Sequence, residues 1–206
     1  MFLFVLLLAL LSSSPASGTS AFTAQAKIEY VTISGTILPN AAPILAQFQE
    51  LESRDEIFVK IASTGGSVSA GYEITNKIQA LQEQGKKVTC YVESGAYSAA
   101  FMIFLACSKR FAAKGSILMF HSPYLTLQRF TLENAESLIA QLKIDREAYL
   151  NTLIAGLVGA DPVWVTKSFL NETEYPAEAF DKLVPGFLTI TADFSPVKGY
   201  RVKGFP

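Results

Sequence analysis

The sequence is poor in the side chains that most often hold metal ions, with one histidine and two cysteines among its 206 residues. His121, Cys90 and Cys107 do not stand at the spacings of a zinc site. We therefore expect no metal ion, and no motif in the chain indicates another cofactor.

Charge is also scarce, because Asp, Glu, Lys and Arg together make up 17% of the residues and the net charge is −1. Without a long basic run, the sequence gives no reason to expect a nucleic-acid partner. Half of the residues are apolar, which is typical of a compact globular protein and not of a disordered one. The length suits one domain with a substantial core. No internal repeat, low-complexity segment or linker indicates a second domain.

Residues 2–26 contain no Lys or Arg, although the segment otherwise has the features of a secretory signal. An apolar run over residues 2–11, too short to span a bilayer, is followed by small and polar residues that end in Ala24-Gln25-Ala26. This pattern predicts a signal peptide over residues 1–26 and a single domain over residues 27–206. The protein would then be exported, to a periplasm or out of the cell. An uncleaved N-terminal anchor is the alternative.

The two cysteines could form a disulfide in an exported chain. Cys90 lies in an apolar, strand-like run, and Cys107 lies near the end of an apolar, helix-like run. Two small buried thiols are the slightly favoured interpretation, and a disulfide is the alternative.

Hydrophobic periodicity predicts strands that alternate with helices through the first two thirds of the chain. The predicted strands are residues 27–37, 56–62, 88–92, 110–112 and 117–120, and the predicted helices are residues 42–51, 67–84 and 98–106. This alternation is typical of an α/β domain with right-handed crossovers. The last third predicts a long helix over residues 131–157, a helix that begins at Asp161-Pro162, a short helix over 176–182, and a strand or tail beyond Pro185.

Ser98 stands where a predicted strand ends and a helix that is apolar on every side begins. The N-terminus of such a helix offers unpaired backbone N–H groups and a favourable dipole, which can stabilise a developing oxyanion. The preceding Gly95-Ala96 turn leaves space around a nucleophile. Taken alone, however, Ser98 is more simply interpreted as the N-cap of the helix.

His121 follows the predicted strand over residues 117–120, at the strand end where active sites of α/β domains collect. A lone histidine is more often structural. The segment Ser63-Thr64-Gly65-Gly66-Ser67 forms another connection from strand to helix, and its glycines could bring backbone amides close to a ligand. A phosphate-binding loop is the rival interpretation, but the Lys-Ser/Thr pair that completes such a loop is absent.

Together the three segments resemble, in order and spacing, the Clp protease proteolytic subunit family. The glycine segment reads Ser63-Thr64-Gly65-Gly66-Ser67-Val68-Ser69-Ala70-Gly71, the serine segment Gly95-Ala96-Tyr97-Ser98-Ala99-Ala100-Phe101, and the histidine segment Met119-Phe120-His121-Ser122-Pro123. The resemblance covers about residues 28–184. It implies an α/β fold of the ClpP/crotonase type, built of repeated ββα units with a C-terminal helical handle, to which the predicted helix over residues 131–157 corresponds.

By this resemblance, the chain would be a serine-type endopeptidase that forms an acyl-enzyme on Ser98, with His121 as general base. The amides of Gly66 and Ala99 would form the oxyanion hole, with Gly65 beside them. Unfolded or short peptides would bind in an extended form along exposed strand edges. The handle would drive assembly into a homo-oligomer.

The acid position departs from the family, because Asn171 stands near the place of the family's catalytic aspartate. With a one-residue gap the position falls on Glu172 instead. Asparagine can orient a neutral histidine, but it cannot stabilise an imidazolium as a negative charge does. We assign the third position to Asn171, with Glu172 and a two-residue dyad as alternatives. Thr64 also departs from the family, where proline stands in the glycine turn.

The predicted export and the missing aspartate decide which alternative functions are considered. An exported protein has no ATP supply, so we expect no ATPase partner. A catalytically weak or inactive scaffold that binds peptides is the alternative function. A crotonase-type enzyme for acyl-thioesters would share the fold, but it would need coenzyme A. Signal-peptide peptidase chemistry would pair serine with a lysine such as Lys109 or Lys114, and the position of His121 argues against it.

Overall fold

The computed structural model describes residues 29–124 and 131–191. The predicted signal peptide over residues 1–26 and the chain beyond Thr191 lie outside the described residues. Within the described ranges, no helix has the length and apolar character needed to cross a membrane. The same ranges contain no group of His, Cys, Asp and Glu side chains suited to a metal ion.

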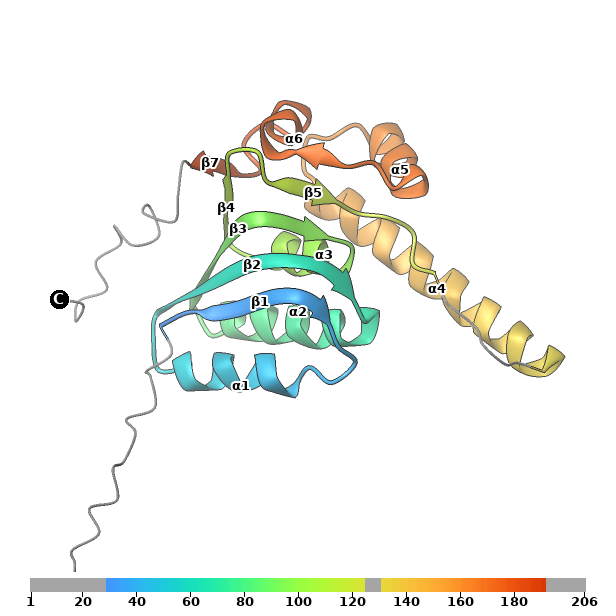
Figure 1. Ribbon diagram of the computed structural model, residues 1–206, viewed down its shortest axis with the longest axis horizontal. Helices are drawn as coiled ribbons and strands as arrows, with labels where there is room; N and C mark the ends of the chain where they lie inside the picture. Colours follow the sequence, from blue (N-terminus) through green and yellow to red (C-terminus); the bar gives the residue numbers. More distant parts are fainter. Residues whose placement is uncertain (1–28, 125–130, 192–206) are drawn as a thin grey trace, which may run out of the picture.

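A mainly parallel sheet forms the centre of the fold (Figure 1). Its strands are β1 (Val31–Ile37), β2 (Glu56–Gly66), β3 (Lys87–Tyr97), β4 (Lys109–Ala113), β5 (Ile117–Met119), β6 (Tyr175–Pro176) and β7 (Thr189–Thr191). The order is β1-β2-β3-β4-β7, and β5 joins both β3 and β6. Among the strand pairs of residues 29–124 and 131–191, only β5–β6 is antiparallel. The predicted α/β class is confirmed.

Six helices connect these strands within the described part of the chain. They are α1 (Ala42–Leu51), α2 (Val68–Glu83), α3 (Ala99–Ala106), α4 (Leu132–Gly156), α5 (Pro162–Asn171) and α6 (Ala177–Leu183). Helices α1 and α2 lie on the same side of the sheet (Figure 1). Local sequence explains two of the starts: Ser67 accepts a hydrogen bond from the Ala70 amide, and Asp161 accepts one from the Val163 amide, just before Pro162. Helix α3 is buried on every side, as its apolar sequence predicts.

Strands β2 and β3 run further than their sequences predict. The predicted strands end at residues 62 and 92, yet β2 continues to Gly66 and β3 to Tyr97. Irregular register allows this, because the β1–β2 pairing shifts by one residue and the β2–β3 pairing by two within the ladder. Gly65, Gly66 and Gly95, which the sequence assigns to turns, are therefore paired within the sheet. The carboxyl ends of β2, β3 and β5 meet at one edge.

Cys90 and Cys107 form a disulfide, so the interpretation as two free thiols is wrong. Cys90 lies in the middle of β3 and Cys107 at the end of α3, and both are buried. The local sequence around each cysteine is apolar and would also suit a buried free thiol. The disulfide forms because α3 runs back along β3 and brings the two Cα atoms to 5.9 Å. Closing a loop of this length contributes roughly 3 kcal/mol to the free energy of unfolding. The loop contains Ser98.

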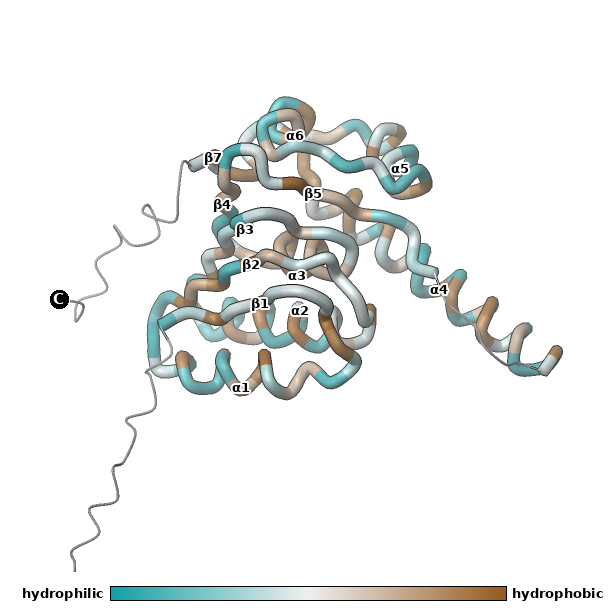
Figure 2. The backbone as a smooth tube through the Cα atoms, viewed as in Figure 1, coloured by the Kyte–Doolittle hydropathy of each residue, from teal (hydrophilic) through white to brown (hydrophobic). Residues whose placement is uncertain are grey.

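Helix α4 extends away from the rest of the domain, and its first half lies furthest out (Figure 1). Hydrophobic and hydrophilic residues alternate along it (Figure 2). Only Tyr149 and Leu153 of this helix are buried, whereas Leu132, Ile139 and Ile144 are more than half exposed, at 71%, 52% and 60%. The projecting helix confirms the predicted long helix and has the form of a handle.

Candidate active site

The pairing of β3 with β5 brings Ser98 and His121 to the same edge of the sheet. Tyr97, the last residue of β3, lies opposite Met119, the last residue of β5. The Ser98 amide then donates a hydrogen bond of 2.8 Å to the Met119 carbonyl. Phe120 anchors the end of β5, since its ring packs against Phe101 of α3 with a centroid distance of 5.1 Å.

Three side chains form a connected chain of hydrogen bonds at this edge. Nε2 of His121 lies 2.8 Å from Oγ of Ser98, within the range expected of a nucleophile and its base. On the other side of the ring, Nδ1 lies 3.2 Å from Oε1 of Glu172. The His121 side chain is 7% exposed and the Glu172 side chain 60% exposed. The imidazole is therefore buried, while the carboxylate stays largely in solvent.

Ser98 occupies the N-cap position of α3, as predicted, but its side chain makes no capping hydrogen bond, so capping does not account for its hydroxyl group. Its backbone has φ of 53° and ψ of −122°, in a region that residues with a Cβ rarely adopt. Conformations of this kind cost about 1–3 kcal/mol and persist where the surrounding structure holds them, often at active sites. The strained turn directs Oγ towards His121 instead of the helix amides. A sharp turn from strand to helix also presents the nucleophile in α/β-hydrolases.

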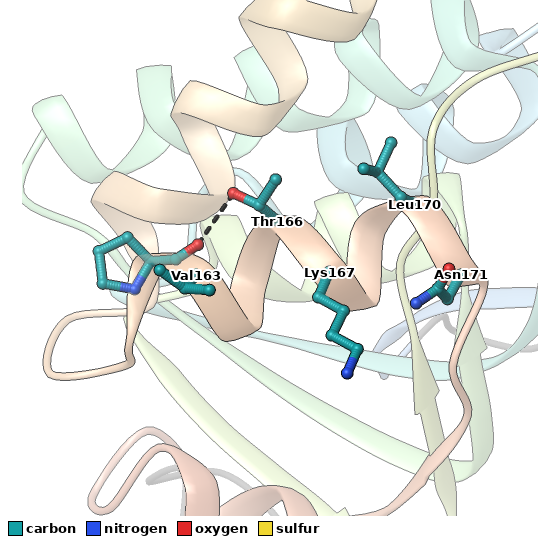
Figure 3. A pocket seen from close by; sticks show the side chains of 6 residues that line it. Val163, Thr166, Lys167, Leu170 and Asn171 are labelled. Carbon is teal, nitrogen blue, oxygen red and sulfur yellow. Dashed lines mark hydrogen bonds between the residues drawn. The ribbon is translucent and has the colours of Figure 1, made fainter.

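Glu172, and not Asn171, is the residue that the structure brings to His121. Asn171 ends α5 and lines a separate hollow with Val163 and Lys167 (Figure 3). Glu172 follows in a left-handed conformation, with φ of 51°, which turns its side chain away from the direction of the helix. The assignment of Asn171 to the third position does not fit this geometry, because Asn171 is still helical and lines the separate hollow, whereas Glu172 lies beyond the helix and bonds His121.

Pairing of β5 with β6 explains how the Glu172 segment reaches the site. Tyr175 of β6 lies opposite Leu118 of β5, and the Ser122 amide donates to the Phe169 carbonyl over 2.8 Å. These bonds hold the chain around Glu172 beside the end of β5. No sequence pattern predicted β6, since it is only two residues long and contains a proline.

Gly65, near the end of β2, faces Ser98 and the start of α3, whereas a Cβ on Gly66 would point at the backbone of Ile37 in β1. A Cβ built on Gly65 would lie 2.7 Å from Ser98 Cβ and 3.1 Å from the Ala99 amide nitrogen. The Gly65 amide donates to Ser63 Oγ over 3.1 Å, so that donor is already used inside the strand. This leaves the amides of Gly66 and Ala99 as the pair considered for an oxyanion, with Gly65 as the spacer that lets the two backbones approach.

A cleft of about 350 Å³ opens over these groups. Its walls contain both polar and apolar side chains, together with the glycine backbone: Thr36, Thr64, Gly65, Gly66, Val68, Ser98, Met119, His121, Pro123, Tyr124 and Glu172. The Tyr124 ring lies 5.4 Å from the His121 ring between centroids. A substrate in this cleft would therefore lie against both Ser98 and the backbone of Gly65 and Gly66.

The segments that carry Ser98 and His121 lie within a stretch of the chain that matches a known protein family. Residues 21–163 match the Clp protease family. The matched segment spans well over half of the chain and includes Ser98, His121, the glycine segment and all of α4. It ends before Glu172, so the identity of the acid rests on geometry alone. The mixed α/β fold agrees with the match, and the chain belongs to the Clp protease family, whose fold is that of a peptidase.

Proposed function

We propose that the protein is a serine peptidase that cleaves peptide bonds through an acyl-enzyme on Ser98. The observation that carries the proposal is the 2.8 Å contact between His121 Nε2 and Ser98 Oγ, made by a serine whose strained backbone leaves its side chain uncommitted to the helix. A capping or purely structural serine would not need either feature.

In the proposed reaction, Ser98 Oγ attacks the carbonyl carbon of the scissile bond while His121 Nε2 takes its proton. The amides of Gly66 and Ala99 stabilise the oxyanion, aided by the positive end of the α3 dipole. Nδ1–H of His121 donates to Glu172, whose charge favours the imidazolium. His121 then protonates the leaving amine, and water releases the acyl group by the same steps in reverse order.

The test of this proposal is covalent labelling of the purified protein with a fluorophosphonate probe, followed by mass mapping of the modified peptide. We expect one adduct per chain, on Ser98. Absence of labelling in folded protein, or labelling elsewhere, would contradict the proposed function.

Replacing Glu172 with glutamine is expected to lower kcat by roughly ten- to a hundredfold. Removing a buried triad acid costs about 10⁴-fold, but Glu172 is 60% exposed, and solvent screening weakens its effect on the imidazolium. Steady-state hydrolysis of a fluorogenic peptide measures the change. Glu174→Gln is the matched control, since Glu174 is also exposed and lies two residues further on.

A further variant separates the two positions considered for the acid. Asn171→Asp should leave kcat unchanged, because Asn171 lies in the hollow of Figure 3 and not beside His121. If Glu172→Gln has wild-type kcat, or if Asn171→Asp raises it, the assignment of the third position to Glu172 is wrong.

An inactive scaffold that binds peptides is a second candidate, and the exposure of Glu172 is the observation that favours it. Such a protein would bind extended peptides in the same cleft without cleaving them. Peptide binding that persists in a variant lacking the Ser98 hydroxyl, combined with no labelling of the wild type, would favour the scaffold over the enzyme.

We further propose that the protein is exported and acts on unfolded or short peptides without an ATPase partner. The buried Cys90–Cys107 disulfide supports export, since disulfides persist in oxidising compartments. N-terminal sequencing of the exported protein tests the cleavage expected after Ala26, and an intact N-terminus would contradict it.

Assembly into a homo-oligomer belongs to the same proposal. Helix α4 exposes large apolar side chains, including Leu132 and Ile144, which are costly to leave in water. Analytical ultracentrifugation measures the state, and a monomer at micromolar concentration would contradict this part of the proposal.

A further inference from the structure

Helix α4 reaches the candidate site through a single aromatic side chain. Tyr149 is 6% exposed, and its hydroxyl donates a hydrogen bond of 3.3 Å to the carbonyl oxygen of Ser98. The other buried residue of this helix, Leu153, is aliphatic and can make no such bond. Tyr149 is thus a polar contact between the projecting helix and the residue that carries the nucleophile.

The Ser98 carbonyl that Tyr149 contacts also begins the hydrogen bonding of α3. It accepts bonds from the amides of Phe101 and Met102, over 3.0 and 3.2 Å. A third donor at this oxygen adds little to the integrity of the helix. It does restrain the peptide unit that follows the strained Ser98 backbone, and such strain persists only where neighbouring groups over-determine the conformation.

The ring of Tyr149 contacts α5, the helix that precedes Glu172. It packs edge-on against Phe169 of α5, with centroids 5.7 Å apart. The Phe169 carbonyl accepts the Ser122 amide, next to His121, and α5 ends just before Glu172. Tyr149 therefore contacts Ser98 directly, and it contacts the helix whose Phe169 carbonyl holds the segment next to His121.

We propose that Tyr149 is a positioning residue that fixes the Ser98 turn in its reactive conformation through the hydrogen bond to the Ser98 carbonyl. This inference rests on the proposed function of Ser98 as nucleophile. Tyr149 does not line the cleft, so it acts through Ser98 and not on the substrate.

The hydroxyl group of Tyr149 can act as a hydrogen-bond donor over the whole working pH range. Burial raises the pKa of its hydroxyl far above the usual range, so the group stays protonated at every working pH. Loss of the hydroxyl should then lower the rate by the same factor at every pH, without moving the midpoints of the pH profile.

The test compares Tyr149→Phe with Tyr72→Phe by the kinetics of labelling with a fluorophosphonate over a range of probe concentrations. Tyr72 is a matched control, because it lies on α2 close enough to interact electrostatically with Tyr149 but outside the site. For Tyr149→Phe we expect the maximal labelling rate to fall roughly two- to tenfold, the effect of losing one neutral hydrogen bond. The half-saturating probe concentration should stay within about twofold of wild type, as for a group outside the binding cleft.

Each other outcome of the experiment overturns the inference in a recognisable way. A maximal rate equal to that of the wild type, or an equal fall in Tyr72→Phe, would show that the hydroxyl does not position Ser98. A rise in half-saturating concentration at constant maximal rate, or a shifted pH midpoint, would assign Tyr149 another role. A wild type that takes up no label would overturn the proposed function first, and this inference with it, whereas a labelled wild type isolates the effect of Tyr149.

Discussion

Replacing Ser98 with alanine is expected to abolish fluorophosphonate labelling and to lower peptide hydrolysis by about 10⁶-fold, the loss that follows removal of a catalytic serine that works as a unit with its base. His121 lies 2.8 Å from the Ser98 hydroxyl, so the variant loses the group that this base would activate. The remaining groups could still bind substrate and stabilise an oxyanion, so some acceleration over water would survive. Labelling and hydrolysis of a fluorogenic peptide measure the two effects.

The control for this variant is Ser94→Ala, which removes the same hydroxyl from an exposed position on β3. Alanine at position 98 would have the same positive φ as serine, so we expect little change in the melting temperature. Hydrolysis by folded Ser98→Ala at more than a hundredth of the wild-type rate would be too fast for a variant without its nucleophile. That result would move the proposed chemistry to another residue.

Much of the fold could be predicted because local signals agree with the tertiary structure. Helix α3 is apolar at every position and is buried at nearly every one. Asp161-Pro162 caps and begins α5, as those residue types favour. The alternation of strands and helices was enough to predict a parallel sheet. The ends of β2 and β3 were not predicted, because the glycine and serine segments that usually break a strand here follow shifts of register.

The candidate site divides in the same way. Ser98 and His121 follow directly from strand ends, so a sequence pattern can predict that they meet. Glu172 depends on a left-handed residue after α5 and on a two-residue strand, and neither has a clear local signal. Tyr149 was also not predicted, since its importance depends on where a long helix crosses the Ser98 turn. Contacts made by distant segments need the tertiary structure.

Gly65→Ala is expected to lower kcat by roughly 10²- to 10³-fold, comparable to the loss of an oxyanion-hole donor. The new Cβ would lie 2.5 Å from the Tyr97 carbonyl oxygen and 2.7 Å from Ser98 Cβ, which is closer than nonbonded atoms approach in folded proteins. It would also lie 3.1 Å from the Ala99 amide nitrogen, in front of the donor proposed for the oxyanion. Either the methyl group fills the space that the oxyanion would occupy, or the ends of β2 and β3 move apart and separate the amides of Gly66 and Ala99. Both changes weaken the proposed oxyanion hole.

A matched variant separates this effect from backbone strain. Gly65 has φ of 81° and Gly85 has φ of 82°, yet a Cβ on Gly85 would meet nothing within 4 Å. Gly85→Ala should therefore carry the same left-handed penalty, on the order of 1 kcal/mol, with wild-type kcat. Because the Gly65 site is crowded, Gly65→Ala should also lower the melting temperature more than Gly85→Ala does, and activity is compared at a temperature where both variants are folded. Equal kcat in the two folded variants would mean that the space between Gly65 and Ala99 is not where the oxyanion forms, and the catalytic proposal would then need a different pair of donors.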